Sequence, residues 1–128
     1  MRTQDPIRIL VVDDNSDLAF IIRESLVVSG WLCVAARNAE ETFAVVPTFK
    51  PHCILMDLGL PGMDGFEITR ELRNFPGLAE IPIIAHTAWD DFQTRIRLRA
   101  ANFAGHIVKP AGISTIITKV ETALSACQ

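Results

Sequence analysis

Apolar residues along the chain fall into two kinds of segment that alternate five times. Short runs rich in β-branched residues, bounded by polar residues, predict strands. These runs cover 7–12, 31–36, 52–56, 81–85 and 106–108. Longer segments with apolar residues three or four positions apart predict helices. These segments cover 16–29, 38–47, 64–74, 90–103 and 113–126.

Polar and special residues mark the ends of the predicted helices. Asn38 and Asp64 are suited to cap the second and third helices, because their side chains accept backbone N–H groups of the first turn. Pro47 bounds the second helix and Gly105 closes the fourth.

In the fourth predicted helix, Phe92, Ile96 and Ala100 share one face. The same segment carries Arg95, Arg97 and Arg99. A charged face of this kind is usually solvated, and the alternative is a surface that contacts a partner.

Strict alternation of strand and helix is typical of a doubly wound α/β fold, with helices on both faces of a parallel sheet. The strands read as continuous apolar runs, as expected when both of their faces are covered. We find no repeat, low-complexity tract or linker. We therefore expect one domain over 7–128, preceded by a loose tail at 1–6.

Composition narrows the class of protein. Apolar residues make up 49% and charged residues 21%, which is ordinary globular composition and excludes whole-chain disorder. The net charge of −3 gives no reason to expect nucleic-acid binding. No apolar run is long enough for a membrane span, and the first residues lack a signal-peptide pattern. The three cysteines, Cys33, Cys53 and Cys127, show no metal-binding spacing. A reduced, cytoplasmic protein is the expectation.

Chemically active residues follow the predicted strands at the same edge of the sheet. Asp13 and Asp14 end the first strand, Asp57 the third, Thr87 the fourth and Lys109 the fifth. In an open parallel sheet, ligands bind beyond the carboxyl ends of the strands. The three aspartates equal in number the net charge of −3, so the acidic excess is concentrated at this edge.

Three close carboxylates repel one another, and a divalent cation removes the conflict. An all-oxygen ligand set of this kind suits Mg²⁺. A metal and a lysine together could neutralise a phosphoryl group transferred to an aspartate. Taken singly, the residues also fit purely structural roles: the Asp13–Asp14 pair could cap a helix, and Lys109 could lie on the surface.

Four motifs make the chain resemble the receiver domain of two-component response regulators. They are VVDDN at 11–15, LMDLGLPGMDG at 55–65, HT at 86–87 and VKP at 108–110. The resemblance spans residues 7–127 and implies the flavodoxin-like receiver fold, with strand order 2-1-3-4-5.

The resemblance also implies roles for individual residues. Asp57 matches the phosphorylated aspartate, Thr87 the switch hydroxyl and Lys109 the lysine that binds the phosphoryl oxygen. Pro110 matches a proline that follows a cis peptide bond. Mg²⁺ is expected to be held by Asp13 (largely through water), Asp14, Asp57 and the backbone carbonyl of Gly59.

One position departs from the family pattern. Receivers usually carry Tyr or Phe three residues before the lysine, and here that switch position is His106. With a histidine shortly before VKP, together with the GLPGMDG run, the chain resembles receivers attached to hybrid histidine kinases. Trp89, two residues after Thr87, is expected either to rim the pocket or to pack against its neighbours.

The implied function is a phosphoacceptor signalling domain that assists its own phosphorylation and dephosphorylation but is not otherwise an enzyme. The implied donor is a histidine kinase or histidine phosphotransfer protein. The fourth helix and fifth strand are expected to face a downstream protein or a second copy, with no direct contact to nucleic acid or membrane. No output module is expected, so the chain reads as a stand-alone receiver or as part of a larger regulator.

Three alternatives stay open from the residues alone. The first, a phosphatase with an aspartyl-phosphate intermediate, usually needs an Asp-x-Asp motif, whereas Asp13 and Asp14 are adjacent. The second, a flavodoxin-type cofactor binder, would meet repulsion between DDNSD and a phosphate. The third is a receiver used only for docking, which the complete set of site residues argues against.

Overall fold

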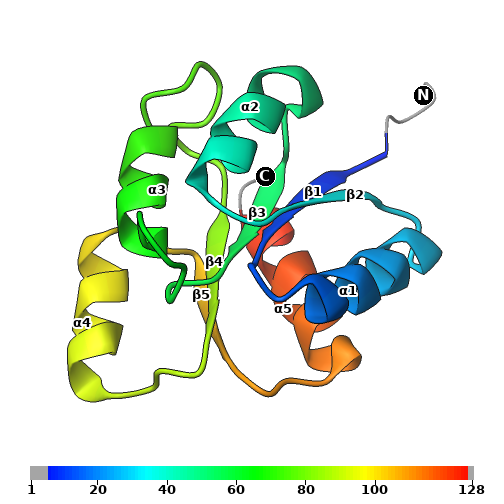
Figure 1. Cartoon of the computed structure of the whole chain (residues 1–128). Helices are drawn as coiled ribbons and strands as arrows, with labels where there is room; N and C mark the ends of the chain where they lie inside the picture. Colours follow the sequence, from blue (N-terminus) through cyan, green and yellow to red (C-terminus); the bar gives the residue numbers. More distant parts are fainter. Residues whose placement is uncertain (1–5, 127–128) are drawn as a thin grey trace.

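The computed structural model describes residues 6–126 and contains a parallel sheet with strand order β2-β1-β3-β4-β5. This order confirms the doubly wound fold (Figure 1). The tail expected at 1–6 and Cys127 lie outside the described residues, except for the exposed Pro6. In chain order, the elements are β1 (Arg8–Val12), α1 (Ser16–Val28), β2 (Leu32–Ala36), α2 (Ala39–Phe49), β3 (Cys53–Met56), α3 (Gly65–Leu72), β4 (Ile83–Thr87), α4 (Phe92–Ala100), β5 (Gly105–Val108) and α5 (Ile113–Ala126).

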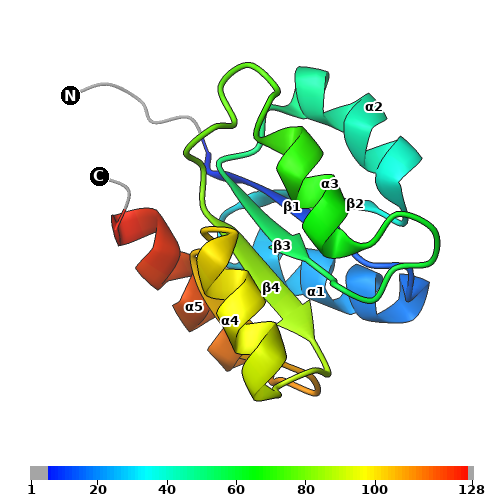
Figure 2. The same ribbon diagram turned by 90° about the vertical axis from the view of Figure 1, so that its left-hand side faces the viewer.

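Two hydrophobic layers lie on opposite faces of the sheet, because successive side chains of a strand point to opposite faces. Ile9 and Val11 of β1 pack under α1 and α5, whereas Leu10 and Val12 pack on the other side. Figures 1 and 2 show α1 and α5 over one face, and α2, α3 and α4 over the other. All four residues of β3 are buried, which accounts for their continuous apolar run.

Side-chain caps begin the helices where the sequence predicts them. The Asn38 side chain accepts the N–H of Glu41, and the Asp64 side chain accepts that of Glu67. The Glu67 side chain also accepts the N–H of Asp64, completing a capping box. The start of α3, at the last residue of the LPGMDG segment, is therefore firmly fixed.

The end of α2 differs from the prediction. Pro47 does not bound α2 but lies inside it, and the helix closes when the N–H of Lys50 binds the carbonyl of Val46. Inside a helix, proline removes one backbone hydrogen bond and its ring crowds the carbonyl four residues earlier. Buried Val46 and partly buried Phe49 pack on the core and hold this last turn in place.

The fourth helix is shorter than predicted, and its apolar face points outward. It ends at Ala100 because Asn102 adopts a left-handed φ of 60°. Gly105 therefore starts β5 instead of closing the helix. Phe92 is 72% exposed, and the core contact comes from Leu98.

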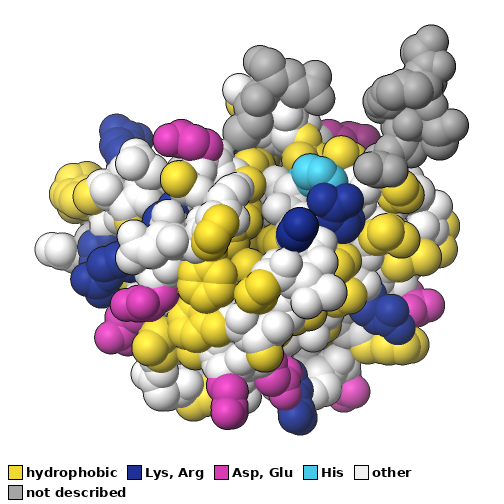
Figure 3. Space-filling view, turned by 90° about the horizontal axis from the view of Figure 1, so that it is seen from above, with side chains coloured by type: hydrophobic (Ala, Val, Ile, Leu, Met, Phe, Trp, Pro, Cys, Tyr) yellow, Lys and Arg dark blue, Asp and Glu magenta, His cyan; other side chains and the backbone are white. Residues whose placement is uncertain are grey.

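The end of the sheet where the strands begin carries none of the predicted site residues. Figure 3 looks onto this end and shows hydrophobic side chains gathered beside lysine, arginine and histidine side chains. A hollow there is lined by apolar residues, including Phe75 and Leu78, and by Arg8 and Lys50. None of the described helices is long and apolar enough to cross a membrane.

Candidate functional site

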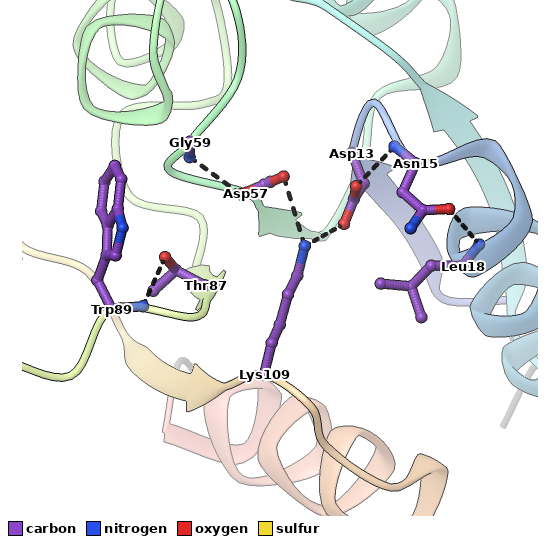
Figure 4. A network of polar contacts seen from close by, with 8 residues as sticks. All are labelled: Asp13, Asn15, Leu18, Asp57, Gly59, Thr87, Trp89 and Lys109. Atoms are coloured by element: carbon purple, nitrogen blue, oxygen red, sulfur yellow. Dashed lines mark hydrogen bonds and ion pairs between the residues drawn. The ribbon is translucent and has the colours of Figure 1, made fainter.

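The predicted site residues meet at the carboxyl edge of the sheet. Asp13 directly follows β1, Asp57 directly follows β3, and Thr87 is the last residue of β4. Lys109 follows β5 and reaches toward both aspartates (Figure 4). Adjacent parallel strands end at the same edge, so residues far apart in sequence become neighbours.

Asp13, Asp14 and Asp57 form a carboxylate cluster. Each offers one oxygen, and these oxygens all lie within 4.8 Å of one another. Asp13 and Asp57 are buried, with relative exposures of 1% and 7%, whereas Asp14 is exposed. The cluster is therefore open to solvent on the side of Asp14.

Lys109 joins the two buried carboxylates. Its Nζ lies 2.8 Å from Oδ2 of Asp13 and 3.4 Å from Oδ2 of Asp57. The peptide bond between Lys109 and Pro110 is cis, as the resemblance implied. One ammonium thus neutralises part of the charge of three carboxylates and leaves the cluster with a net negative charge.

Backbone N–H groups orient the remaining carboxylate oxygens. The N–H of Asn15 donates to Oδ1 of Asp13 at 2.9 Å, and the N–H of Gly59 donates to Oδ1 of Asp57 at 3.0 Å. Asn15 also caps α1, so the loop after β1 holds both the cap and the carboxylate. For Gly59, the structure assigns a contact to the N–H, and the predicted role of its carbonyl stays a prediction.

Burial and charge shift the ionisation of the two central groups. Burial raises the pKa of Asp57, and the charge of Asp13 adds to this, against the opposing effects of the Gly59 N–H and of Lys109. Burial acts to lower the pKa of Lys109, but its hydrogen bond to Asp13 and the two negative charges outweigh it, so that pKa is raised. Lys109 therefore stays an ammonium at neutral pH.

Thr87 is buried, and its hydroxyl faces the loop that follows β4. Its Oγ1 accepts the N–H of Trp89 at 3.2 Å, and within the described residues it forms no hydrogen bond to Asp57. Nε2 of His106 lies 2.9 Å from the Trp89 carbonyl, to which it donates as an N–H. The two predicted switch residues are therefore connected through the backbone of Trp89. The sequence pattern carried no signal for this link, because backbone atoms make it.

The Trp89 side chain borders the acceptor Asp57. This agrees with the first of the two expectations for Trp89, that it rims the pocket. Its ring lies 3.7 Å from the place that a Cβ of residue 59 would occupy, and Oδ1 of Asp57 lies 3.8 Å from the same place. Trp89 is 47% exposed, so it forms part of the rim of the pocket. Figure 4 shows the indole on the Gly59 side of Asp57.

Gly65 is a position that sequence analysis did not single out. A Cβ there would overlap the backbone carbonyl oxygen of Asp57 and would lie 2.9 Å from Cα of Leu58. The first turn of α3 therefore packs directly against the backbone of the acceptor loop. The Asp-Gly pair that closes LPGMDG was the available signal, because glycine often marks such a close approach.

The donor set fits a hard divalent cation. All side-chain ligands are carboxylate oxygens, two are held by backbone N–H groups, and the exposed Asp14 leaves access for solvent. Mg²⁺ prefers one or two protein carboxylates together with several waters. The cluster also retains the negative charge needed to attract such an ion.

Comparison with known proteins places this geometry in a family. The family model described as the response regulator receiver domain matches residues 9–121. The chain is 31% identical over 116 residues to the phosphate regulon transcriptional regulatory protein PhoB of Pseudomonas aeruginosa, covering 91% of this chain and 51% of that protein. It is 29% identical over 119 residues to the polar-differentiation response regulator DivK of Brucella anthropi, covering 93% of this chain and 97% of DivK.

A solved structure agrees in fold. The chemotaxis protein CheY4 of Vibrio cholerae superposes with a TM-score of 0.89 at 22% identity, covering 93% of this chain and 99% of that one. The chain thus spans about half the length of PhoB and nearly all of DivK. The chain belongs to the response regulator receiver domain family of two-component signalling.

Proposed function

We propose that the chain accepts a phosphoryl group on Asp57 and relays this signal by changing shape. The observation that carries the proposal is the placement of Asp57: it is buried, lies beside the ammonium of Lys109 and belongs to a cluster of three carboxylates. An isolated loop carboxylate would have neither partner. Family membership supports the same assignment.

The proposed donor is a phosphohistidine of a histidine kinase or histidine phosphotransfer protein. A carboxylate oxygen of Asp57 forms a bond to phosphorus while the phosphorus–nitrogen bond of the donor breaks and its electron pair returns to the imidazole. The Gly59 N–H holds Oδ1 of Asp57, and Lys109 lies on the side of Oδ2. Lys109 is placed to neutralise charge on the transferred group.

Mg²⁺ would be held by Asp13, Asp14, Asp57 and, as the resemblance implies, the carbonyl of Gly59. When bound, it would offset the charge between the carboxylate and the incoming phosphoryl group. Without added positive charge, two buried carboxylates and an anionic donor repel one another. Lys109 alone supplies only one compensating charge.

The proposed shape change starts at Lys109 and Thr87. A phosphoryl group on Asp57 offers oxygen acceptors to both side chains and competes for the hydrogen bonds that they now form. Thr87 moving toward Asp57 would release the N–H of Trp89, whose carbonyl is bound by His106 on β5. The signal would thereby reach β5 and the loop that leads into α4.

The exposed face of α4 is the proposed output surface, together with β5. Phe92 and Ile96 are exposed there, although both are large and apolar. A downstream protein or a second copy of the chain would cover them. The proposed working location is the cytoplasm, and the proposed receiver domain spans 7–128.

Phosphorylation in solution tests this function. The protein is incubated with acetyl phosphate and Mg²⁺, and its intact mass is recorded. We expect the mass of one phosphoryl group to be gained with Mg²⁺ and not with EDTA. No gain under either condition would support the docking-only alternative, and release of inorganic phosphate over many turnovers would support the phosphatase alternative.

A further inference from the structure

Helices α3 and α4 leave between them a groove that the proposed function does not use. Its volume is about 580 Å³, within the range of small-molecule sites. The groove exists because the facing positions are small: α3 contributes Thr69, and α4 and its cap contribute Ala100 and Ala101. Figure 2 looks onto these two helices.

All the charged side chains that line the groove are basic. Arg70 and Arg73 come from α3 and its cap, Arg97 comes from α4, and the lining contains no acidic residue. Within residues 6–126, neither Arg70 nor Arg97 forms an ion pair. Positive charge is thus concentrated here in a chain whose net charge is −3.

The partial negative charges at the helix ends offset only part of the positive charge of these arginines. Both helices end beside the groove, and each carboxyl end carries a partial charge of about −0.5. Two such ends offset about one positive charge. Three guanidinium groups line the groove, so it stays cationic after this correction.

Two of the arginines are held in place. The guanidinium of Arg97 stacks over the ring of Phe66 at 3.9 Å, and Phe66 is itself in edge contact with Phe103. A stacked guanidinium keeps its N–H edge available for an acceptor. Arg73 donates to the carbonyls of Leu78 and Ile81 and fixes the end of the groove.

A buried hydroxyl at the same place lacks a partner. Thr69 lines the groove and is 2% exposed, and its Oγ1 forms no hydrogen bond within the described part of the chain. Unsatisfied buried polar groups are uncommon in folded proteins. Because Thr69 lines the groove, a ligand bound there is a candidate partner for this hydroxyl.

We propose that the groove binds a small organic phosphate carrying at least two negative charges, held between Arg70 and Arg97. Two guanidinium groups on separate helices match the several oxygens of such a ligand, because each pairs with phosphate through two parallel hydrogen bonds. A recess between helices suits a small molecule better than a flat acidic protein surface. The inference does not depend on phosphorylation of Asp57. A ligand bound in the groove would, however, bridge α3 and α4.

The test is a binding titration by calorimetry and by amide chemical shifts, in buffer with EDTA, because Mg²⁺ would complex the probes. The probes are ADP, inorganic pyrophosphate and adenosine. We expect ADP and pyrophosphate to bind and to shift amides of α3 and α4, and adenosine to have no effect. ADP binding tighter than that of pyrophosphate would show that the organic part is also recognised.

Variants locate the site. Arg70→Ala and Arg97→Ala should each weaken ADP binding about tenfold or more, since each removes charge-assisted hydrogen bonds. Arg99→Ala is the matched control, because Arg99 lies on α4 but does not line the groove. Asp57→Asn should leave binding unchanged. Ala100→Leu, which fills the groove without removing charge, should also weaken it.

Three results would overturn the inference. The first is the absence of binding by both ADP and pyrophosphate. The second is equal weakening by Arg99→Ala and Arg97→Ala, which would indicate nonspecific attraction. The third is a set of shifts confined to the loops that carry Asp13 and Asp57. None of these results would bear on the proposed role of Asp57, which is tested separately with Mg²⁺ and a phosphoryl donor.

Discussion

Gly65 packs against the backbone carbonyl of Asp57 so closely that no side chain fits between them. This contact joins the first turn of α3 to the loop that carries the proposed phosphoacceptor. The position of Asp57 therefore depends on a residue that is itself chemically inert.

Gly65→Ala tests this dependence. Alanine normally favours a helix over glycine, but here its Cβ must displace backbone atoms, so we expect a loss of about 1–3 kcal/mol in unfolding free energy, as for other overpacked sites. Phosphorylation from acetyl phosphate should slow as well. Gly112→Ala is the control, because nothing lies within 4 Å of its added Cβ. Equal stability of the two variants would contradict the close contact.

Mg²⁺ affinity should depend on the exposed member of the carboxylate cluster. Asp14→Ala removes one of the three carboxylates, and we expect the dissociation constant for Mg²⁺ to rise about tenfold or more, because Mg²⁺ gives up its water reluctantly. Trp89 fluorescence is a suitable readout, since its ring borders Asp57. Asp17→Ala, on the exposed side of α1, should bind Mg²⁺ like the unaltered protein. Equal affinity in the two variants would refute the metal site.

Loss of the phosphoryl group should be slow. The positions that border the acceptor are Gly59 and Trp89, and neither has a side-chain oxygen that could orient an attacking water. Combining Gly59→Asn with Trp89→Glu should speed phosphate release several-fold, because an amide and a carboxylate can position that water. Ile96→Glu adds the same carboxylate to the exposed face of α4 and should have no effect. Slower release in the double variant would show that these positions do not control the water.

His86 should make the protein less stable as the pH falls. It is 3% exposed, Nε2 has no hydrogen-bond partner within the described residues, and burial lowers its pKa from 6.5 to about 4. Between these two values the unfolded chain binds a proton that the folded chain excludes. The contribution of neutral His86 is thus complete above pH 6.5 and is lost as the pH falls toward 4.

The expected loss between pH 7 and pH 4.5 is on the order of 2 kcal/mol. Denaturant unfolding at these two pH values measures this difference in unfolding free energy. In the His86→Leu variant, the difference should be smaller by about the same amount. Buried carboxylates such as Asp57 titrate in both proteins, so the comparison isolates the histidine. If the difference in unfolding free energy between the two pH values is unchanged in the leucine variant, His86 is not the titrating group.

The doubly wound fold class and the meeting of the site residues followed from patterns that burial imposes on a sequence, whereas the strand order 2-1-3-4-5 was implied only by the family resemblance. Strands covered on both faces must be apolar throughout, as β3 is, and residues that follow parallel strands must share an edge. Asp13, Asp57 and Lys109 accordingly lie together as predicted. Caps such as Asp64 confirmed a helix start because they act within one turn.

Features that depend on tertiary packing could not be predicted. Helical spacing identified the face of α4 formed by Phe92 and Ile96 but could not show that this face points away from the core. Asn102 ended the helix in a left-handed conformation, for which asparagine is a weaker sequence signal than the Gly105 on which the prediction relied. The connection of Thr87 to His106 passes through backbone atoms of Trp89, which no side-chain pattern reveals.

Locating the phosphoryl group decides whether Asp57 is the acceptor. Asp57→Asn and Asp64→Asn are compared after incubation with acetyl phosphate and Mg²⁺, with the intact mass as the readout. Asp64→Asn is the matched control, because asparagine caps a helix as well as aspartate does. We expect one phosphoryl group on the Asp64→Asn protein and none on the Asp57→Asn protein. Full phosphorylation of the Asp57→Asn protein would contradict the assignment of Asp57.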